Sequence, residues 1–423
     1  MSKMSPLHSV RSFAWFTVIC EIACAQTFVV SADGSGDFRD IPNALAATGD
    51  GATLIVRPGS YSPFSITNRS VKILGTSPGG YPYVGLGTVS ISGTSKDREV
   101  MIVGLEFAGG LGISQCKGAI VLQDVIIHKQ STIDSCQNVH VLDSVATAVG
   151  GNSYGYYPAT LQVTDSTLEV TRSALRGADG RTDFVWSVSG CPALSVSGTT
   201  LWLTATSLGG GSGASSSSGG GAGPAGGGTA LKVISSSLAH ISGACVLSGG
   251  SGGNAPYWSF GAPAGSGVDC DTSSRVVAAG SIMVPGIPGQ PPSPFWPPAP
   301  PFTGPVVNLP ELRSPRLSSS GTFAPNGSVQ WKVQAQPGAL GILAVGGAPP
   351  GFTYYDFLFP GALLIAPLVF VPLVVDATGT SIFTIAVPST HPGGVAYFAQ
   401  AATFNANMTQ LLPSGSLLTI GRY

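Results

Sequence analysis

The segment CKGAIVLQDVII (116–127) returns in altered form four times along the chain. The later copies are CQNVHVLDSVAT (136–147), PATLQVTDSTLEV (158–170), CPALSVSGTTLWL (191–203) and GTALKVISSSLAHI (228–241). In each copy an apolar pair at i and i+2 precedes a polar turn and a further apolar residue. We place one valine of each copy at the same repeat position: Val121, Val141, Val163, Val196 and Val233. Short alternating strands at a spacing of about 20 residues predict a solenoid whose rungs stack on a continuous core.

The composition agrees with an all-β protein that has many tight turns. Only 9% of the residues are charged, against about 25% in ordinary globular proteins, while 59 residues are Gly and 33 are Pro. The formal net charge is −1, and the chain has no run of Lys or Arg. This pattern argues against nucleic acid and against an anionic membrane as partners.

The first 25 residues have the pattern of a secretory signal peptide. Lys3 and Arg11 accompany an apolar core, FAWFTVIC (13–20), and small residues in ACA (23–25) precede the expected cleavage point. The core is too short to span a bilayer. We therefore predict that the protein is secreted or held at the cell surface, with no transmembrane segment in the mature chain. A lipoprotein anchored at Cys24 is the alternative, which Glu21 and Ile22 disfavour.

We predict three regions after the signal peptide. A right-handed parallel β-helix spans 26–283, with Gly/Ser-rich loops at 207–229 and 247–267 that we expect to be flexible, because their side chains can bury little area. A Pro-rich linker follows at 284–315. Alternating strands at 316–423 predict a small C-terminal β-sandwich.

Residues 27–61, which include DGSGDF (33–38) and RPGSY (57–61), resemble the start of pectinesterases and related β-helix proteins of the pectin-lyase-like fold. Asp40 is placed to cap a short helix at that start. The C-terminal region, with VAYFAQAA (395–402) and SGSLLTI (414–420), resembles a domain carried by many secreted bacterial proteins of uncharacterised function. These resemblances imply the fold and an exported, modular protein.

The resemblance also implies where a pectinesterase site would lie, since that family uses two Asp, an Arg and Gln side chains on consecutive rungs. LQDV (122–125) and RTDFVW (181–186) are similar to two of its phrases, which carries the roles over to Gln123, Asp124 and Asp183. However, Asp124 and Asp183 stand 59 residues apart, and the family's R-P-W phrase has no counterpart. Pectinesterase activity is therefore disfavoured.

A second candidate pair is Asp143 and Asp165, which the repeat places at one position on successive rungs. Carboxylates about 5 Å apart suit a retaining glycosidase, or could hold Ca²⁺ if the protein is a pectate-lyase-like enzyme; otherwise we expect no cofactor and no metal. The alternative is that both are turn residues bonded to local backbone.

Two further groups could bind a glycan. A charged loop at 176–186 contains Arg176, Asp179, Arg181, Asp183 and Trp186. Arg176 and Trp186 are its candidate glycan-binding residues, and Arg181 and Asp183 are candidate catalytic residues if the protein is a polysaccharide-active enzyme. The alternative role of the loop is a self-satisfied cluster of salt bridges. The loop at 247–267 contains Tyr257, Trp258 and Phe260, which could stack on sugar rings or cover the end of the solenoid.

Five cysteines remain after residue 25, at 116, 136, 191, 245 and 270. We expect a ladder of small buried side chains, with a Cys116–Cys136 or Cys245–Cys270 bridge as the alternative. His140 is predicted to face outward into solvent. Together these observations favour an exported, modular β-helix protein that is a non-catalytic surface, structural or glycan-binding component. The alternative is a polysaccharide-active enzyme: a lyase, a glycosidase or a pectinesterase-like protein.

Overall fold

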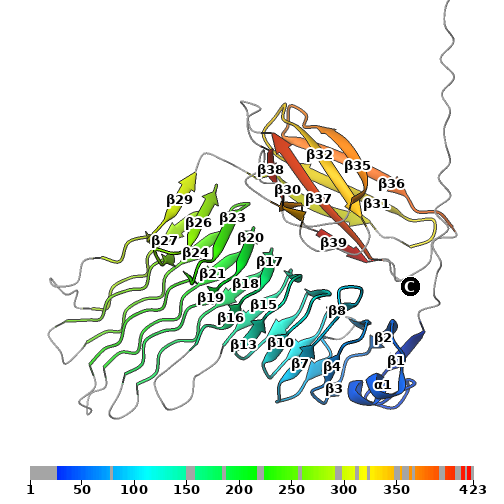
Figure 1. Ribbon diagram of the computed structural model, residues 1–423, viewed down its shortest axis with the longest axis horizontal. Helices are drawn as coiled ribbons and strands as arrows, with labels where there is room; N and C mark the ends of the chain where they lie inside the picture. Colours follow the sequence, from blue (N-terminus) through cyan, green and yellow to red (C-terminus); the bar gives the residue numbers. More distant parts are fainter. Residues whose placement is uncertain are drawn as a thin grey trace, which may run out of the picture.

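The computed structural model consists of a long parallel β-helix and a smaller antiparallel domain that lies along one of its sides (Figure 1). It describes residues 26–423 apart from short segments. These are 77–79, 149–157, 183–186, 217–222, 256–259, 291–297, 310–313, 322–323, 347–352, 355–361, 364–366, 390–395, 405–410, 415–416 and 421–423. The predicted signal peptide lies outside the described residues.

Three parallel sheets form the β-helix, and each full rung contributes one strand to each sheet in the chain order A, B, C. Sheet A contains β1 (Thr27–Val30), β2 (Ala52–Val56), β5 (Val71–Gly75), β8 (Glu99–Val103), β11 (Ala119–Gln123), β14 (Val139–Leu142), β17 (Thr167–Thr171), β20 (Thr200–Thr204), β23 (Leu238–Ser242), β26 (Arg275–Ala279) and β29 (Val306–Leu309). Sheet B contains β3 (Ser60–Tyr61), β6 (Tyr83–Val84), β9 (Glu106–Phe107), β12 (Ile126–Ile127), β15 (Val145–Thr147), β18 (Ala174–Arg176), β21 (Ser207–Gly209), β24 (Val246–Ser248) and β27 (Ile282–Val284). Sheet C contains β4 (Ser65–Thr67), β7 (Val89–Ser92), β10 (Leu111–Ser114), β13 (Ser131–Asp134), β16 (Leu161–Thr164), β19 (Leu194–Ser197), β22 (Leu231–Ile234), β25 (Val268–Cys270) and β28 (Phe302–Thr303).

The single described helix, α1 (Ile41–Ala47), follows the first strand of sheet A, and its buried face packs on the first rung. The Asp40 side chain accepts a hydrogen bond from the Ile41 N–H, and Pro42 stands in the first turn. The predicted cap is confirmed.

The register of the strands differs from the repeat alignment that the sequence suggested. Val121 lies beside His140 in sheet A, not beside Val141. Val163 pairs with Ile133 and Val196, which belong to sheet C. The alignment therefore joined sheet A in the first two copies to sheet C in the later ones, because strands of both sheets end in a similar polar turn.

Both kinds of turn depend on one residue in the left-handed backbone region. At the corner after sheet A this residue is Asp124, Asp143 or Arg172, with φ of 52°, 50° and 49°. At the corner after sheet C it is Ser135 or Asp165, with φ of 54° and 46°. Asp adopts this conformation more readily than most residues, because its short side chain can bond to local backbone.

A small polar side chain follows many of these corners and links one rung to the next. The Thr199 hydroxyl donates to the Ser197 carbonyl at 2.9 Å and accepts from the Ser166 N–H at 3.3 Å. Cys136 stands at the equivalent position after Ser135, and its N–H donates to the Ser166 hydroxyl at 2.9 Å. All five described cysteines are buried free thiols. The expected ladder of small side chains is present for Cys116 and Cys136, while Cys191 lies in the glycine-rich region described below.

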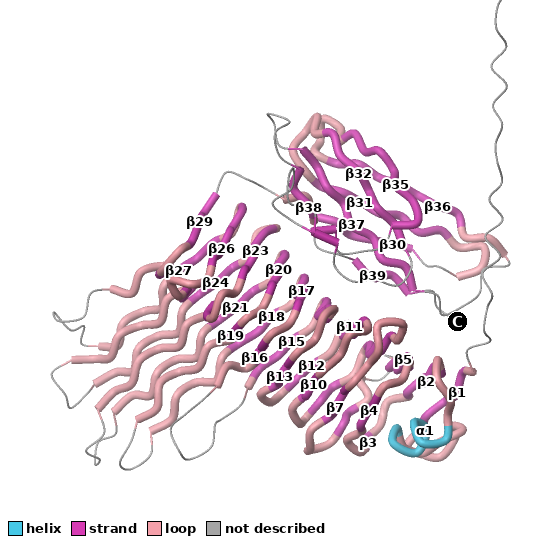
Figure 2. Tube along the Cα trace, viewed as in Figure 1, coloured by secondary structure: helices cyan, strands magenta, loops and turns pink. Residues whose placement is uncertain are grey.

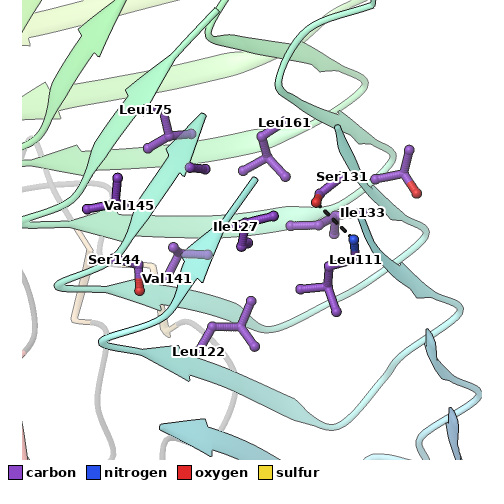
Figure 3. Close-up of a pocket in the computed structure, with 12 residues that line it drawn as sticks. Leu111, Leu122, Ile127, Ser131, Ile133, Val141, Ser144, Val145, Leu161 and Leu175 are labelled. Atoms are coloured by element: carbon purple, nitrogen blue, oxygen red, sulfur yellow. Dashed lines mark hydrogen bonds between the residues drawn. The ribbon is translucent and has the colours of Figure 1, made fainter. Parts of the chain in front are cut away.

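The interior of the β-helix is filled with aliphatic side chains. Leu122, Val141, Leu161 and Leu175 converge from all three sheets on a cavity of about 20 Å³ (Figure 3). A space of that size holds at most a single water molecule. The interior is a packed core and offers no ligand site there.

The glycine-rich loops are hydrogen-bonded to one another, contrary to the expectation that they would be flexible. Four loops between sheets B and C run side by side beyond the body of the β-helix (Figure 2). We call their described parts, within 177–193, 210–230, 249–267 and 285–301, the glycine-rich layer. In it the N–H groups of Gly213 and Ser216 donate to the next loop at 2.7 and 3.0 Å, and that of Gly210 donates at 2.9 Å to Ser248, the last residue of β24. This three-residue period is that of an extended polyproline II-type chain.

The β-helix continues into the segment that was predicted to be a linker. β28 pairs with β25 and β29 pairs with β26, so residues within 284–315 supply a final rung. The many prolines around these two strands argued against a β-structure in this segment. However, β28 and β29 lie at the edges of their sheets, where proline is tolerated.

The C-terminal domain is a β-sandwich. One sheet contains β30 (Arg316–Gly321), β31 (Ser328–Gln334) and β36 (Thr380–Ala386); the other contains β32 (Leu340–Gly346), β35 (Pro367–Val374), β37 (Ala396–Phe404), β38 (Leu411–Pro413) and β39 (Leu417–Ile420). A separate hairpin pairs β33 (Thr353–Tyr354) with β34 (Ala362–Leu363). Trp331 from the first sheet and Leu343 and Ala399 from the second share one buried core.

The sandwich docks on the outer face of sheet A. Met101, Val121 and Leu142 of the β-helix form a buried cluster with Ala344 and Phe398 of the sandwich. A face of the solenoid that would otherwise be exposed is therefore covered by the chain itself.

Candidate functional site

The predicted pair Asp143 and Asp165 does not stack. The Asp143 N–H bonds to Thr171 at the corner after sheet A, whereas the Asp165 N–H bonds to Ser197 at the corner after sheet C. Their separation follows from the register described above. The prediction that Asp143 and Asp165 form a neighbouring pair of carboxylates is therefore wrong.

Asp143 instead belongs to a polar cluster, which we call the carboxylate corner: Tyr81, Gln123, Asp124, Asp143 and Arg172. Arg172 binds both carboxylate oxygens of Asp143, with Nε–Oδ1 at 2.6 Å and Nη2–Oδ2 at 2.8 Å. Gln123 Nε2 donates to Asp143 Oδ2 at 3.4 Å, and the Tyr81 hydroxyl donates to Asp124 Oδ1 at 2.8 Å. Three successive corners of sheet A thus bring Asp124, Asp143 and Arg172 into one column.

The electrostatics of the carboxylate corner follow from these contacts. The bidentate guanidinium offsets the charge of Asp143, whose side chain is 34% exposed, and such pairs are held in a fixed geometry. The hydrogen bond to Asp124, helped by burial, raises the pKa of Tyr81 above its usual 10.0. Tyr81 therefore stays a proton donor to that carboxylate at neutral pH.

An open cleft lies beside this corner, between the β-helix and the sandwich. Its two parts measure about 350 and 640 Å³ and share Gly243, Ala244, Arg316 and Gln334 among their lining residues. Arg172 lines the smaller part and so connects the cleft to the carboxylate corner. Among the described lining residues there is no carboxylate.

The charged loop at 176–186 is only partly described. Arg176 and Asp179 form an exposed ion pair at 3.1 Å, and Asp179 Oδ1 also accepts the Ser212 N–H at 2.8 Å. Arg181 is exposed, and its carbonyl accepts the Val188 N–H. Asp183 and Trp186 lie outside the described residues.

The predicted aromatic group is also described only at one end. Tyr257 and Trp258 lie outside the described residues. Phe260 is 36% exposed at the start of the returning part of its loop. Whether these residues bind a glycan stays a prediction.

His140 is buried, and the expectation that it faces solvent is wrong. It does point outward from sheet A, but the sandwich covers it, with the Phe398 ring centroid 6.2 Å away. Its ring bonds to Glu169 Oε2 at 2.7 Å and to Asn138 Oδ1 at 2.8 Å. The sequence pattern correctly set its direction; the docking of a distant domain was the missing information.

The described residues contain neither a metal-binding cluster nor a membrane-spanning helix. No group of three or more His, Cys, Asp or Glu there is placed to hold a metal ion. No described helix is long and apolar enough to cross a membrane.

Comparison with known proteins adds little beyond the architecture. The enzymatically active domain of tailspike protein 4 from bacteriophage CBA120 is similar over 90% of this chain, with 10% identity and a TM-score of 0.25. ORF18 of Geobacillus virus E2 is similar over 88% of this chain and 69% of its own, with 12% identity and a TM-score of 0.22. This chain spans 65% of the length of the tailspike domain. No family model matches the chain, and no curated protein is significantly similar to it.

At such TM-scores the similarity carries no argument about function. The class of protein rests on the sheets themselves, which define a right-handed parallel β-helix followed by a small β-sandwich. Within that class, this chain has its sandwich docked on sheet A and a cleft at their junction.

Proposed function

We propose that this protein is an exported, modular β-helix component that binds a glycan in the cleft without cleaving it. The cleft carries the proposal. Its volume lies in the range of ligand sites, and its described lining offers Arg, Gln, Ser and Thr side chains together with exposed backbone. These groups suit a polyhydroxylated ligand, and a polysaccharide or another cell-surface component is the partner that we infer.

The same lining disfavours hydrolysis inside the cleft. Most glycoside hydrolases place two carboxyl groups on either side of the scissile bond, about 5–9.5 Å apart. The described residues of the cleft supply none. Binding without turnover is therefore the better account of this site.

The carboxylate corner favours a second candidate, a polysaccharide-active enzyme. It brings two Asp, an Arg and a Gln together on consecutive rungs, which is the set that the pectinesterase resemblance implies. Asp124 and Asp143 stand one rung apart, about 5 Å in such a stack, whereas the sequence prediction had paired Asp124 with Asp183. The bidentate bond of Arg172 to Asp143 supports a structural role for that carboxylate instead.

A panel of purified polysaccharides, with and without Ca²⁺, separates the two candidates. We expect retention of at least one glycan by the mature protein and no release of reducing or unsaturated ends. Release that disappears in Asp143→Asn or Asp124→Asn would establish the enzyme instead. Asp165→Asn is the matched control, because Asp165 holds the same left-handed conformation at the other corner, and Asn tolerates it.

A further inference from the structure

We infer that the cleft selects a saccharide with an acidic group, which Arg316 binds; this inference rests on the proposed glycan binding. Arg316 begins β30, is exposed, and lies opposite Gln334 in the neighbouring strand β31. Both residues line both parts of the cleft. No ion pair joins Arg316 to another described residue.

Among the described residues that line the cleft, Arg316 is the cation available to bind an acidic ligand. Arg172 also lines the cleft, but both oxygens of Asp143 already bind its guanidinium. The remaining described lining residues are uncharged. The cleft as described therefore has an excess of one positive charge, and an arginine binds carboxylate or sulfate oxygens with two parallel hydrogen bonds.

Short residues of the β-helix line part of the cleft. Along the corner after sheet A, the side chains shorten from Asp143 and Arg172 to Ala205, Gly243 and Gly280, which have φ of 51°, 68° and 59°. These short residues line the cleft and leave room beside the corner for a ligand.

A buried polar group points to a ligand independently. The Ser314 side chain lines the larger part of the cleft and is only 9% exposed. Its hydroxyl has no hydrogen-bond partner among the described residues. Leaving such a group unsatisfied costs free energy, and a sugar hydroxyl that reached it from the cleft would offset that cost.

The lining also argues against other anionic ligands. A nucleotide base usually stacks on an aromatic side chain, and the described lining residues include none. A polyanion such as nucleic acid requires several cations. One cation among hydroxyl and amide groups fits a single acidic substituent on a sugar.

The test is a glycan array of matched triplets, in which one oligosaccharide core is displayed neutral, with a uronic acid, and with a sulfate ester. The mature protein is compared with Arg316→Gln, which removes the charge, and with Gln336→Trp, which adds bulk to the lining of the larger part of the cleft. Lys332→Gln is the control: it makes the same charge change on the same face of β31 but does not line the cleft.

We expect the wild-type protein to prefer acidic members, with the uronate and sulfate arms showing which acid it takes. Arg316→Gln and Gln336→Trp should lower that affinity about tenfold or more, as expected for the loss of a charge-assisted hydrogen bond, while Lys332→Gln should not. Equal binding of neutral and acidic members would overturn the inference and leave glycan binding intact. Acidic preference that survives in both cleft variants would place the site elsewhere, and no binding at all would overturn the proposed function as well.

Discussion

The rungs of the β-helix are held together by packed side chains, whereas its glycine-rich layer is held together by packed backbone. In the rungs, buried aliphatic side chains such as Ile73, Ile102 and Leu201, each 0% exposed, fill the space between three sheets. In the glycine-rich layer, backbone meets backbone. A Cβ added to Gly250 would lie 1.9 Å from the Gly211 carbonyl oxygen, and one added to Gly286 would lie 2.0 Å from that of Gly250.

The difference teaches that glycine-rich sequence is not always flexible sequence. Gly loses more conformational entropy on ordering than any other residue. Here that cost is offset by hydrogen bonds between loops in both directions. Gly213 donates to Ser251 in the following loop at 2.7 Å, whereas Gly211 donates to Cys191 at 2.9 Å and Gly250 to Gly228 at 2.7 Å, each in the preceding loop. Truncating a buried side chain should therefore destabilise the rungs, and adding a side chain to a glycine should destabilise the layer.

The largest effect is expected from Leu201→Ala, which leaves a cavity in the core. Deletions of this kind cost about 4 kcal/mol of unfolding free energy, within a usual range of 2–5. Urea denaturation measures the loss. Leu86→Ala is the control, since Leu86 is 74% exposed, and it should change the stability by less than about 0.5 kcal/mol. Equal effects of the two would show that the rungs are not close-packed.

Gly250→Ala tests the opposite side of the comparison. The added methyl group must displace the Gly211 carbonyl, and overpacking of this kind costs about 2 kcal/mol. Gly223→Ala is the matched control within the same layer, because its Cβ would meet no atom within 4 Å.

Both glycine variants are compared by thermal denaturation, and hydrogen exchange adds a second readout. The amides of Gly211 and Gly228 should exchange faster in Gly250→Ala and be protected in the wild type and in Gly223→Ala. Rapid exchange of these amides in the wild-type protein would mean that the layer is flexible, as the sequence first suggested.

Thr199→Val tests the ladder that connects the rungs, with a smaller expected effect. The substitution keeps the shape of the side chain but removes the acceptor for the Ser166 N–H. Leaving a buried donor unsatisfied costs about 1–2 kcal/mol. Thr200→Val is the control, because Thr200 is the next residue, is half-buried and takes no part in the ladder. Urea denaturation of both variants should separate them; identical midpoints would assign the ladder no energetic role.

The fold could be predicted from the sequence because a repeated alternation of apolar residues predicts stacked parallel strands. The register could not. Strands of sheets A and C both end in a left-handed residue followed by a small polar one, as at Asp143-Ser144 and Asp165-Ser166. The pattern marks a corner without saying which corner it is, so Asp143 and Asp165 were paired wrongly.

The candidate site was less predictable, since it depends on contacts between distant segments. Tyr81 reaches Asp124 across 43 residues, and Arg172 reaches Asp143 across 29. The cleft is lined by residues of both domains, and no local sequence pattern predicts where the sandwich docks. For the same reason His140 was correctly predicted to point outward from its strand but wrongly predicted to be solvated.

The face of sheet A that the sandwich covers shows a third kind of packing, in which charged groups are buried. A substitution on this face has the smallest expected effect. Glu99 lies on this face and is mostly buried, and its Oε1 has no hydrogen-bond partner among the described residues. Burial raises the pKa of its carboxyl above the ordinary 4.5, although Lys72 and His140 act in the other direction.

A carboxyl whose pKa is raised by folding favours the folded state while it is protonated. Its contribution is therefore fully present below about pH 4.5 and is lost as the pH rises through the higher folded value. Glu99→Gln keeps the shape and removes the titration. At pH 7 the variant should be more stable than the wild type, because the amide avoids the cost of ionising a carboxyl that burial disfavours, and at pH 4 the two should agree.

Urea denaturation at the two pH values measures this difference, with the exposed Asp134→Asn as the control for a general change in net charge. A gain in stability at pH 4 equal to that at pH 7 would show that shape, and not ionisation, limits the packing at Glu99. A loss at pH 7 would mean that the carboxylate is a favourable partner of Lys72 and His140, and that the docked face tolerates charge as readily as the exposed corners do.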